Sequence, residues 1–189
     1  MFIAIFDNNI EMVQLLMDCA NENNIFLEIN EKNEKGIYPL MEAYSKNNFE
    51  MVKLLMDYAN KNNIILELNE KDKDGNYPLL LAINNNNIEI VHLLMDYANK
   101  NNIILELNEK DKNGIYPLLL VIGKKNSKMV KLLMDYANEN NSFLKINEKD
   151  KDGDYSLMVA VYNDSIEIVQ LLMDYANKNN IILELNEKK

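Results

Sequence analysis

The chain has no arginine, one histidine (His92) and one cysteine (Cys19) among its 189 residues. Arginine is the side chain best suited to bidentate phosphate contacts, so its absence, with a net charge of −10, disfavours a nucleic-acid or anionic-membrane surface. A single histidine cannot build a histidine-based triad or a facial metal site. A single cysteine forms no intrachain disulfide and lies in no zinc-binding pattern. We therefore expect no metal, no cofactor and no catalytic residue in this chain, and hence no enzyme.

Long apolar runs are also missing. The apolar stretch at residues 1–6 is far too short to span a bilayer, and it lacks the basic segment and the cleavage site of a signal peptide. We therefore expect no membrane contact. An unpaired thiol is compatible with a reducing compartment, so we expect a cytoplasmic location. With 48% hydrophobic residues, the chain can still bury a core.

What the chain has is a sequence repeat with a step of 39 residues. The turn glycines are Gly36, Gly75, Gly114 and Gly153. The string Leu-Leu-Met-Asp begins at Leu15, Leu54, Leu93, Leu132 and Leu171. Self-similarity at such a period indicates stacked supersecondary units, none of which can bury its apolar face alone.

These markers predict a single array over residues 1–189. Its expected parts are a partial first repeat over 1–33 that lacks its turn, then repeats over 34–72, 73–111, 112–150 and 151–189. The chain begins inside a first helix, and neither end has the polar capping unit that shields the end faces of an array. We therefore expect a fragment of a longer array, with neighbouring repeats of a longer chain as further partners.

The repeat at residues 72–111 shows what each unit should form. Residues 72–75 (Asp-Lys-Asp-Gly) predict a turn, because Asp caps such a turn with its own side chain and Gly supplies positive φ. Pro78 suits the first turn of a short apolar helix over 79–83, and the Asn run at 84–87 should break it by adopting the left-handed conformation. A longer second helix should run from Ile88 to Lys100 and end at residues 101–102. Residues 103–107 should be extended.

Three strings of this repeat carry a family resemblance. They are Asp72-x-x-Gly75-x-Tyr77-Pro78-Leu79-x-x-Ala82, Ile88-Glu89-Ile90-Val91-x-Leu93-Leu94 and Leu107-Asn108-x-x-Asp111. In this order and spacing they resemble the ankyrin repeat, and the pattern recurs along the whole chain. The resemblance implies a mainly α fold, an ankyrin-like helical solenoid of stacked helix-turn-helix repeats with extended finger loops. It also implies that the partner is another protein.

The unit departs from the family pattern in two respects. The usual ankyrin unit has about 33 residues, and the excess of about six residues falls around 99–104, between the second helix and the extended return. Ala98 also replaces the helix-ending Gly of the family, which favours a second helix longer by about one turn. In the Thr-Pro-Leu-His opening, Tyr77 replaces Thr and Leu80 replaces His. We therefore expect apolar stacking to replace the hydrogen bonds between neighbouring turns.

The acidic turns raise the question of a calcium site. In Glu70-x-Asp72-x-Asp74-Gly75, alternating oxygen atoms precede a glycine, as in an EF-hand loop. That loop needs a bidentate Glu six residues after the glycine, where this chain has Leu81. A plain turn is therefore favoured.

Three rows of polar side chains allow both a functional and a structural interpretation. Carboxylates that repeat about 10 Å apart are too distant for acid–base pairing, which favours a solvated or structural role; they are Asp18, Asp57, Asp96, Asp135 and Asp174. The tyrosines are more suited to packing along the second helices than to stacking on bases; they are Tyr58, Tyr97, Tyr136 and Tyr175. A basic cluster is a solvated face or a contact for an acidic partner; it consists of Lys124, Lys125, Lys128 and Lys131.

Positions that hold a stack should be the same in every repeat, whereas positions that face a partner are free to differ. The second-helix residues of this chain are nearly invariant, and the differences gather at the turn tips and after the first helix. The resemblance places these positions on a concave face that binds proteins, as the curvature of a solenoid also predicts. The candidate partner-binding residues are Glu34, Lys35, Ile37, Lys46, Lys73, Asp74, Asn76, Asn85, Lys112, Asn113, Ile115, Lys124, Lys151, Asp152, Asp154 and Tyr162.

The main functional hypothesis is therefore a non-catalytic module that binds another protein. Near-identity of the repeats favours an alternative, a passive spacer within a longer array, since selection for one partner should diversify the tips further. A third hypothesis is the recruitment domain of a larger protein whose activity lies outside this chain.

Overall fold

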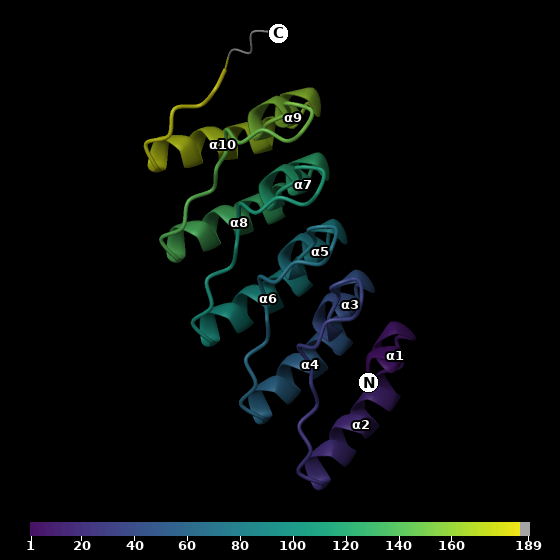
Figure 1. The fold of residues 1–189 in the computed structure, drawn as a ribbon. Helices are drawn as coiled ribbons and strands as arrows, with labels where there is room; N and C mark the ends of the chain where they lie inside the picture. The colour runs from purple at the N-terminus through teal and green to yellow at the C-terminus, as the bar shows by residue number, and fades with distance from the viewer. Residues whose placement is uncertain (186–189) are drawn as a thin grey trace. The chain divides into compact units, whose positions relative to one another are not determined.

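The computed structural model describes residues 1–185 and contains ten α-helices in that part of the chain (Figure 1). Residues 186–189, the last four of the expected final repeat, lie outside the described residues. The helices are α1 (Phe2–Phe6), α2 (Ile10–Glu22), α3 (Pro39–Ser45), α4 (Phe49–Lys61), α5 (Pro78–Asn84), α6 (Ile88–Lys100), α7 (Pro117–Gly123), α8 (Ser127–Glu139), α9 (Ser156–Tyr162) and α10 (Ile166–Lys178). No strand occurs among residues 1–185. The expected mainly α fold is confirmed.

The helices begin and end at residues whose chemistry favours a helix start or a helix end, as expected from the sequence. Pro78 occupies the first turn of α5, where its missing N–H costs no hydrogen bond. The side chain of Asn87 caps α6 by accepting the backbone N–H groups of Glu89 and Ile90. After α5 the chain turns at Asn86 with φ 55°, and after α6 it turns at Asn102 with φ 54°. Asparagine adopts this left-handed conformation more readily than most side chains, which accounts for the Asn-rich breaks.

The chain forms two compact units, Met1–Leu105 and Glu106–Lys189, and each is described by itself. In the first unit, the short helices α1, α3 and α5 pack in sequence, and so do the long helices α2, α4 and α6 (Figure 1). In the second unit, α7 packs on α9 and α8 packs on α10. Within each unit, successive helical hairpins therefore stack in chain order. The boundary lies inside the expected repeat 73–111, and the 39-residue repeat boundaries stay a prediction.

An asparagine in each return segment connects neighbouring repeats. Asn69 donates its Nδ2 to the carbonyl of Ile104 at 2.7 Å, and Asn108 donates to the carbonyl of Phe143 at the same distance. Asn108 also accepts the backbone N–H of Lys145 through Oδ1 at 2.8 Å. The side chain thus replaces the two hydrogen bonds of a strand pairing, and it fixes one repeat in register with the next.

The expectation that only apolar stacking joins neighbouring turns was wrong. Tyr116, which stands where the family has Thr, donates its hydroxyl to the carbonyl of Glu148 at 2.7 Å and lies 3.2 Å from Ser156 Oγ. Tyr38 likewise donates to the carbonyl of Glu67. A phenol reaches further than a threonine hydroxyl, so it contacts the backbone of the following repeat. The second-helix tyrosines pack as expected. Three of them also accept a backbone hydrogen bond at the hydroxyl: Tyr58 from Leu27 N at 3.2 Å, Tyr97 from Leu66 N at 3.4 Å and Tyr175 from Leu144 N at 3.0 Å.

Candidate partner-binding surface

The turn tips are built by an acidic or amide side chain that caps its own turn. In the first unit, Asp72 accepts the backbone N–H groups of Asp74 and Asn76, both at 2.8 Å, and its second oxygen accepts Asn76 Nδ2 at 3.0 Å. In the second unit, Asp150 accepts the N–H groups of Asp152 and Asp154, both at 2.9 Å. Asp72 and Asp150 thus cap the turns that the sequence predicts at these positions.

Neighbouring tips lie in direct contact within a unit. The backbone N–H of Lys73 donates to the carbonyl of Lys35 at 3.0 Å. A Cβ atom on Gly36 would lie 3.1 Å from Asp72 Cα, and one on Gly114 would lie 2.9 Å from Lys151 N. Both glycines also have positive φ, so they are required for conformation and for space. The tips therefore form a continuous, ordered edge on each unit.

Most of the candidate residues at the tips are exposed. In the first unit these are Glu34, Lys35, Lys73 and Asp74. In the second unit they are Lys112, Asn113, Lys151 and Asp152. The third tip position is partly covered in each repeat, at Ile37, Asn76, Ile115 and Asp154. A solvated edge of mixed charge is thus available for contact on both units.

The candidates that follow the first helices differ in their availability. Asn85 donates its Nδ2 to the carbonyl of Tyr44 at 2.6 Å, so its amide group joins two repeats of the first unit. Lys46 lies over the ring of Phe6 and 3.5 Å from Glu42. In the second unit Lys124 is partly exposed, whereas Tyr162 is 91% exposed. Tyr162 is therefore the aromatic side chain of this group most open to a partner.

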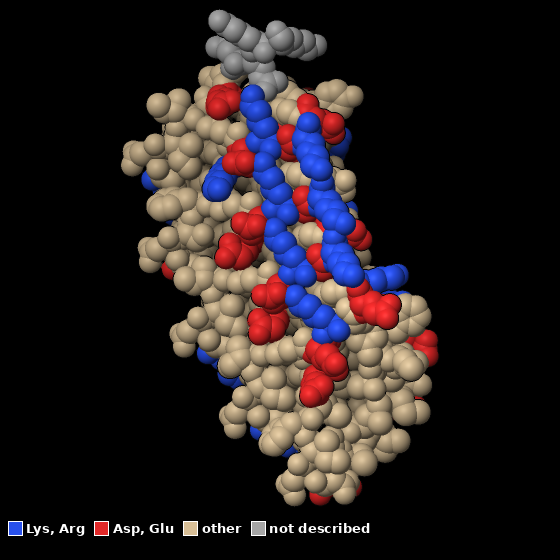
Figure 2. Space-filling view, in the orientation of Figure 1, with Lys and Arg blue, Asp and Glu red and all other residues tan. Residues whose placement is uncertain are grey.

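Ion pairs between repeats lie beside the tips, and sequence reasoning missed them. Lys32 Nζ lies 2.6 Å from Glu70 in the first unit, and Lys110 Nζ lies 2.5 Å from Glu148 in the second. The Lys110 ammonium lowers the pKa of the Glu148 carboxyl by a hydrogen bond. Figure 2 shows lysines on this face with carboxylates beside them. Recurrence of lysine at the same place in each repeat was the signal that could have revealed these pairs.

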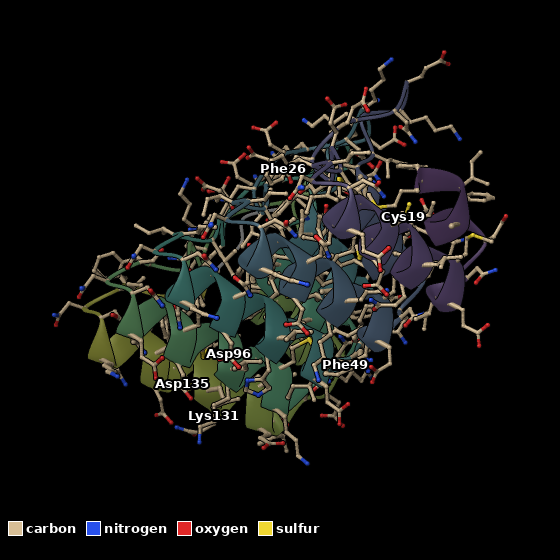
Figure 3. All side chains as sticks on the ribbon, turned by 90° about the horizontal axis from the view of Figure 1, so that it is seen from below. Cys19, Phe26, Phe49, Asp96, Lys131 and Asp135 are labelled. Atoms are coloured by element: carbon tan, nitrogen blue, oxygen red, sulfur yellow. The ribbon has the colours of Figure 1, made fainter. Side chains whose placement is uncertain are left out.

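The second helices present to solvent an aspartate that recurs in every repeat. Asp96 on α6 and Asp135 on α8 are exposed (Figure 3), as expected for the aspartate row. Asp18 accepts a hydrogen bond from Gln14 at 2.9 Å on the same helix. His92 is exposed, as expected. Within residues 1–185, no group of three or more His, Cys, Asp or Glu side chains is arranged to hold a metal ion.

A shallow groove separates successive second helices in each unit. Between α2 and α4 it has a volume of about 210 Å³ and is lined by residues that include Asp18, Asp57 and Tyr58. Between α8 and α10 the equivalent residues line a groove of about 140 Å³. Seven of the eight lining positions carry the same residue in both grooves, so the groove is a property of the stack. It therefore distinguishes the second-helix face from the variable tip edge.

A membrane-spanning helix needs about 20 consecutive apolar residues, and the longest of the described helices have 13. None of those within residues 1–185 combines enough length with enough apolar character to cross a bilayer.

Comparison with protein families agrees with the helical arrangement. The family described as ankyrin repeats (3 copies) matches residues 1–104 and 99–182. No curated protein gives a significant match to the chain. Ankyrin repeats are generally protein–protein interaction modules and are typically non-enzymatic. With matches that cover most of its length and helical hairpins stacked within each unit, the chain belongs to the ankyrin-repeat family.

Proposed function

We propose that this chain is a non-catalytic module that binds another protein through its turn tips and the ends of its first helices. The observation that carries the proposal is a contrast within the chain. The buried positions of the second helices are nearly invariant from repeat to repeat, whereas the exposed tips change, as from Glu34 to Lys73 and from Lys35 to Asp74. Variation at exposed positions on a fixed scaffold is what a surface for a specific partner requires.

The rigidity of the tips supports this proposal. Their backbone is fixed by side-chain caps and by contacts such as Lys73 N to Lys35 O. A partner would therefore meet an ordered edge, and little entropy would be lost on binding. The mixed charge of the edge favours a protein over a polyanion, because the candidate tips include both Lys151 and Asp152.

A pull-down with the whole chain as bait tests the proposal. We expect simultaneous alanine substitution of Lys73, Asp74, Lys112 and Asn113 to abolish capture of the partner. The matched control replaces four exposed second-helix residues by alanine, Asp57, His92, Asp96 and Asp135. Capture should persist in this control. Unchanged capture by the tip variant would overturn the proposed surface.

The alternative function is a passive spacer in a longer array, or a recruitment domain of a larger protein whose activity lies elsewhere. The near-identity of the repeats favours the spacer. If the chain is a spacer, then no protein should be captured in a manner that depends on any exposed residue. The flanking sequence of the gene separates the two cases, since many equivalent repeats favour a spacer and an adjacent effector domain favours recruitment.

We also propose a cytoplasmic location. The thiol of Cys19 is exposed and forms no disulfide within the described residues, which suits a reducing compartment. Microscopy of a fluorescently tagged chain tests this proposal, and a signal confined to the secretory pathway would overturn it.

A further inference from the structure

The lengthened segment after each second helix exposes a large apolar side chain at the same position in every repeat, and in the first repeat the preceding residue, Ile25, is also exposed. In the first unit these side chains are Phe26, Ile65 and Ile104, with exposed fractions of 69%, 56% and 65%. The residues that follow Ile65 and Ile104, Leu66 and Leu105, are only 1% exposed. Figure 3 shows Phe26 among the loop segments beyond α2. The buried leucines contribute to the core. The exposed side chains Phe26, Ile65 and Ile104, here called the exposed row, do not.

The backbone that carries this row is held in place by the preceding repeat. The carbonyl of Ile65 accepts Asn30 Nδ2, and the carbonyl of Ile104 accepts Asn69 Nδ2, both at 2.7 Å. Packed helical hairpins lie about 10 Å apart, so the three side chains should repeat with about that spacing. The row is thus an ordered apolar surface with a fixed period.

The charge beside the row is negative in the first unit. Glu28 and Glu67 lie two positions after Phe26 and Ile65, are exposed, and make no ion pair with any residue in the described part of the chain. Side chains that are two residues apart in an extended segment lie on the same side of the backbone. In the second unit the equivalent position after Phe143 is Lys145, and Glu184 after Ile182 lies 3.8 Å from Lys149 Nζ, so the two carboxylates without an ion pair lie in the first unit.

We propose that Phe26, Ile65 and Ile104 form a docking row for a basic amphipathic helix of a partner protein. Apolar residues seven positions apart in a helix are separated by about 10.5 Å, which matches the spacing of the row. Lysine or arginine on either side of that apolar stripe would lie against Glu28 and Glu67. The same carboxylates repel an anionic membrane, and a purely apolar contact would need no acidic border. This surface is separate from the turn tips, and the proposal is independent of theirs.

A designed peptide tests this proposal with the whole chain in solution. The probe is a fluorescently labelled 21-residue helix with leucine at three positions seven apart, lysine beside each leucine and alanine elsewhere. Fluorescence anisotropy should show saturable binding to the native chain. The triple variant Phe26→Ser, Ile65→Ser, Ile104→Ser should bind the peptide at least about tenfold more weakly, because apolar anchors dominate such contacts.

Two further variants test the charge and the place of the site. The double variant Glu28→Lys, Glu67→Lys should also weaken binding strongly, and Lys145 shows that this position of the repeat takes a lysine. The control Phe143→Ser, Ile182→Ser removes the exposed apolar side chains at the equivalent positions of the second unit and should leave the affinity of the peptide within about twofold. Circular dichroism confirms that each variant keeps its helices.

Three results would overturn the proposal. The first is equal peptide affinity for the native chain and the triple serine variant. The second is equal affinity for a peptide in which glutamate replaces every lysine. The third is binding to phosphatidylcholine vesicles that the serine substitutions abolish while peptide affinity is unchanged, since the row would then contact lipid. The tip variant of the pull-down experiment should bind the peptide normally, so that failure of one proposal can be told from failure of the other.

Discussion

The backbone N–H of Leu144 donates a hydrogen bond of 3.0 Å to the hydroxyl of Tyr175, which lies 31 residues further along the chain. Leu144 belongs to one return segment and Tyr175 to the second helix of the following repeat. Both residues are buried, so water is excluded from this contact. The tyrosine row therefore serves each unit as hydrogen-bond partner for a backbone group that would otherwise be buried alone.

We expect Tyr175→Phe to destabilise the chain by about 1 to 3 kcal/mol, because it leaves the Leu144 N–H without its partner. The matched control is Tyr44→Phe, since the buried Tyr44 hydroxyl has no hydrogen-bond partner among residues 1–185. That control should leave stability unchanged or raise it by up to about 1 kcal/mol. Urea denaturation followed by circular dichroism measures both variants. Equal losses in the two variants would contradict the assignment.

Alanine substitution of the turn glycines distinguishes the cost of backbone strain from the cost of a steric clash. In Gly114→Ala the residue has φ +84° and its new Cβ would lie 2.9 Å from Lys151 N, so strain and a steric clash both occur. In Gly153→Ala the residue has φ +88°, and no atom of residues 1–185 lies within 4 Å of the new Cβ, so only strain occurs. We expect losses of about 2 to 3 kcal/mol for Gly114→Ala and about 1 kcal/mol for Gly153→Ala. A larger loss at Gly153 in urea denaturation would show that the contact between tips contributes nothing.

The left-handed residue that follows the first helix is strained in the repeat where it is a lysine instead of an asparagine. Lys125 has φ 56°, at the position where Asn86 stands in another repeat with φ 55°. We expect Lys125→Asn to raise the free energy of unfolding by about 0.5 to 1 kcal/mol, because asparagine tolerates the left-handed conformation better. The reciprocal change Asn86→Lys should lower it by a similar amount. Thermal unfolding of both variants checks the sign, and a gain in stability from Asn86→Lys would refute the explanation.

Tyr116 should make stability depend on alkaline pH. Burial raises the pKa of its phenol from 10.0 to about 12, and its hydroxyl donates to the Glu148 carbonyl only when protonated. A pKa that is higher in the folded state gives stability that is complete below pH 10 and is lost as the pH rises towards 12. The free energy of unfolding should fall by about 2 to 3 kcal/mol in total. The test is the difference in the free energy of unfolding between the native chain and Tyr116→Phe, measured across pH 9 to 12. This difference should narrow as the pH rises.

Much of the fold could be predicted from local patterns. The limits of α6 and the break at Asn86 follow from helical spacing and asparagine chemistry, which act on neighbouring residues. The hydroxyl contacts of Tyr38 and Tyr116 could not be predicted in this way, since their partners are backbone carbonyls about 30 residues away that no side chain marks. The self-capping of the tips was predictable from Asp72 and Asp150.

The residues of the candidate surface were harder to predict from the sequence than the fold. Variation within the chain identifies Asn85 as readily as Lys73, yet the Asn85 amide is bonded to Tyr44 whereas Lys73 is exposed. Whether a variable position faces solvent or the next repeat depends on packing, which the repeat pattern alone does not specify. The exposed row at Phe26, Ile65 and Ile104 was missed because an apolar residue in a return segment is expected to be buried.

Site-specific photo-crosslinking tests the proposed binding of a protein by the turn tips most directly. A benzophenone amino acid is placed singly at Lys35, Lys73 and Lys151 on the tips and at Asp57, Asp96 and Asp135 on the second helices, all of which are exposed. We predict that illumination links one and the same protein to the tip positions and none to the second-helix positions. Crosslinks from the second helices alone, or no protein linked at any tip, would contradict the proposed function.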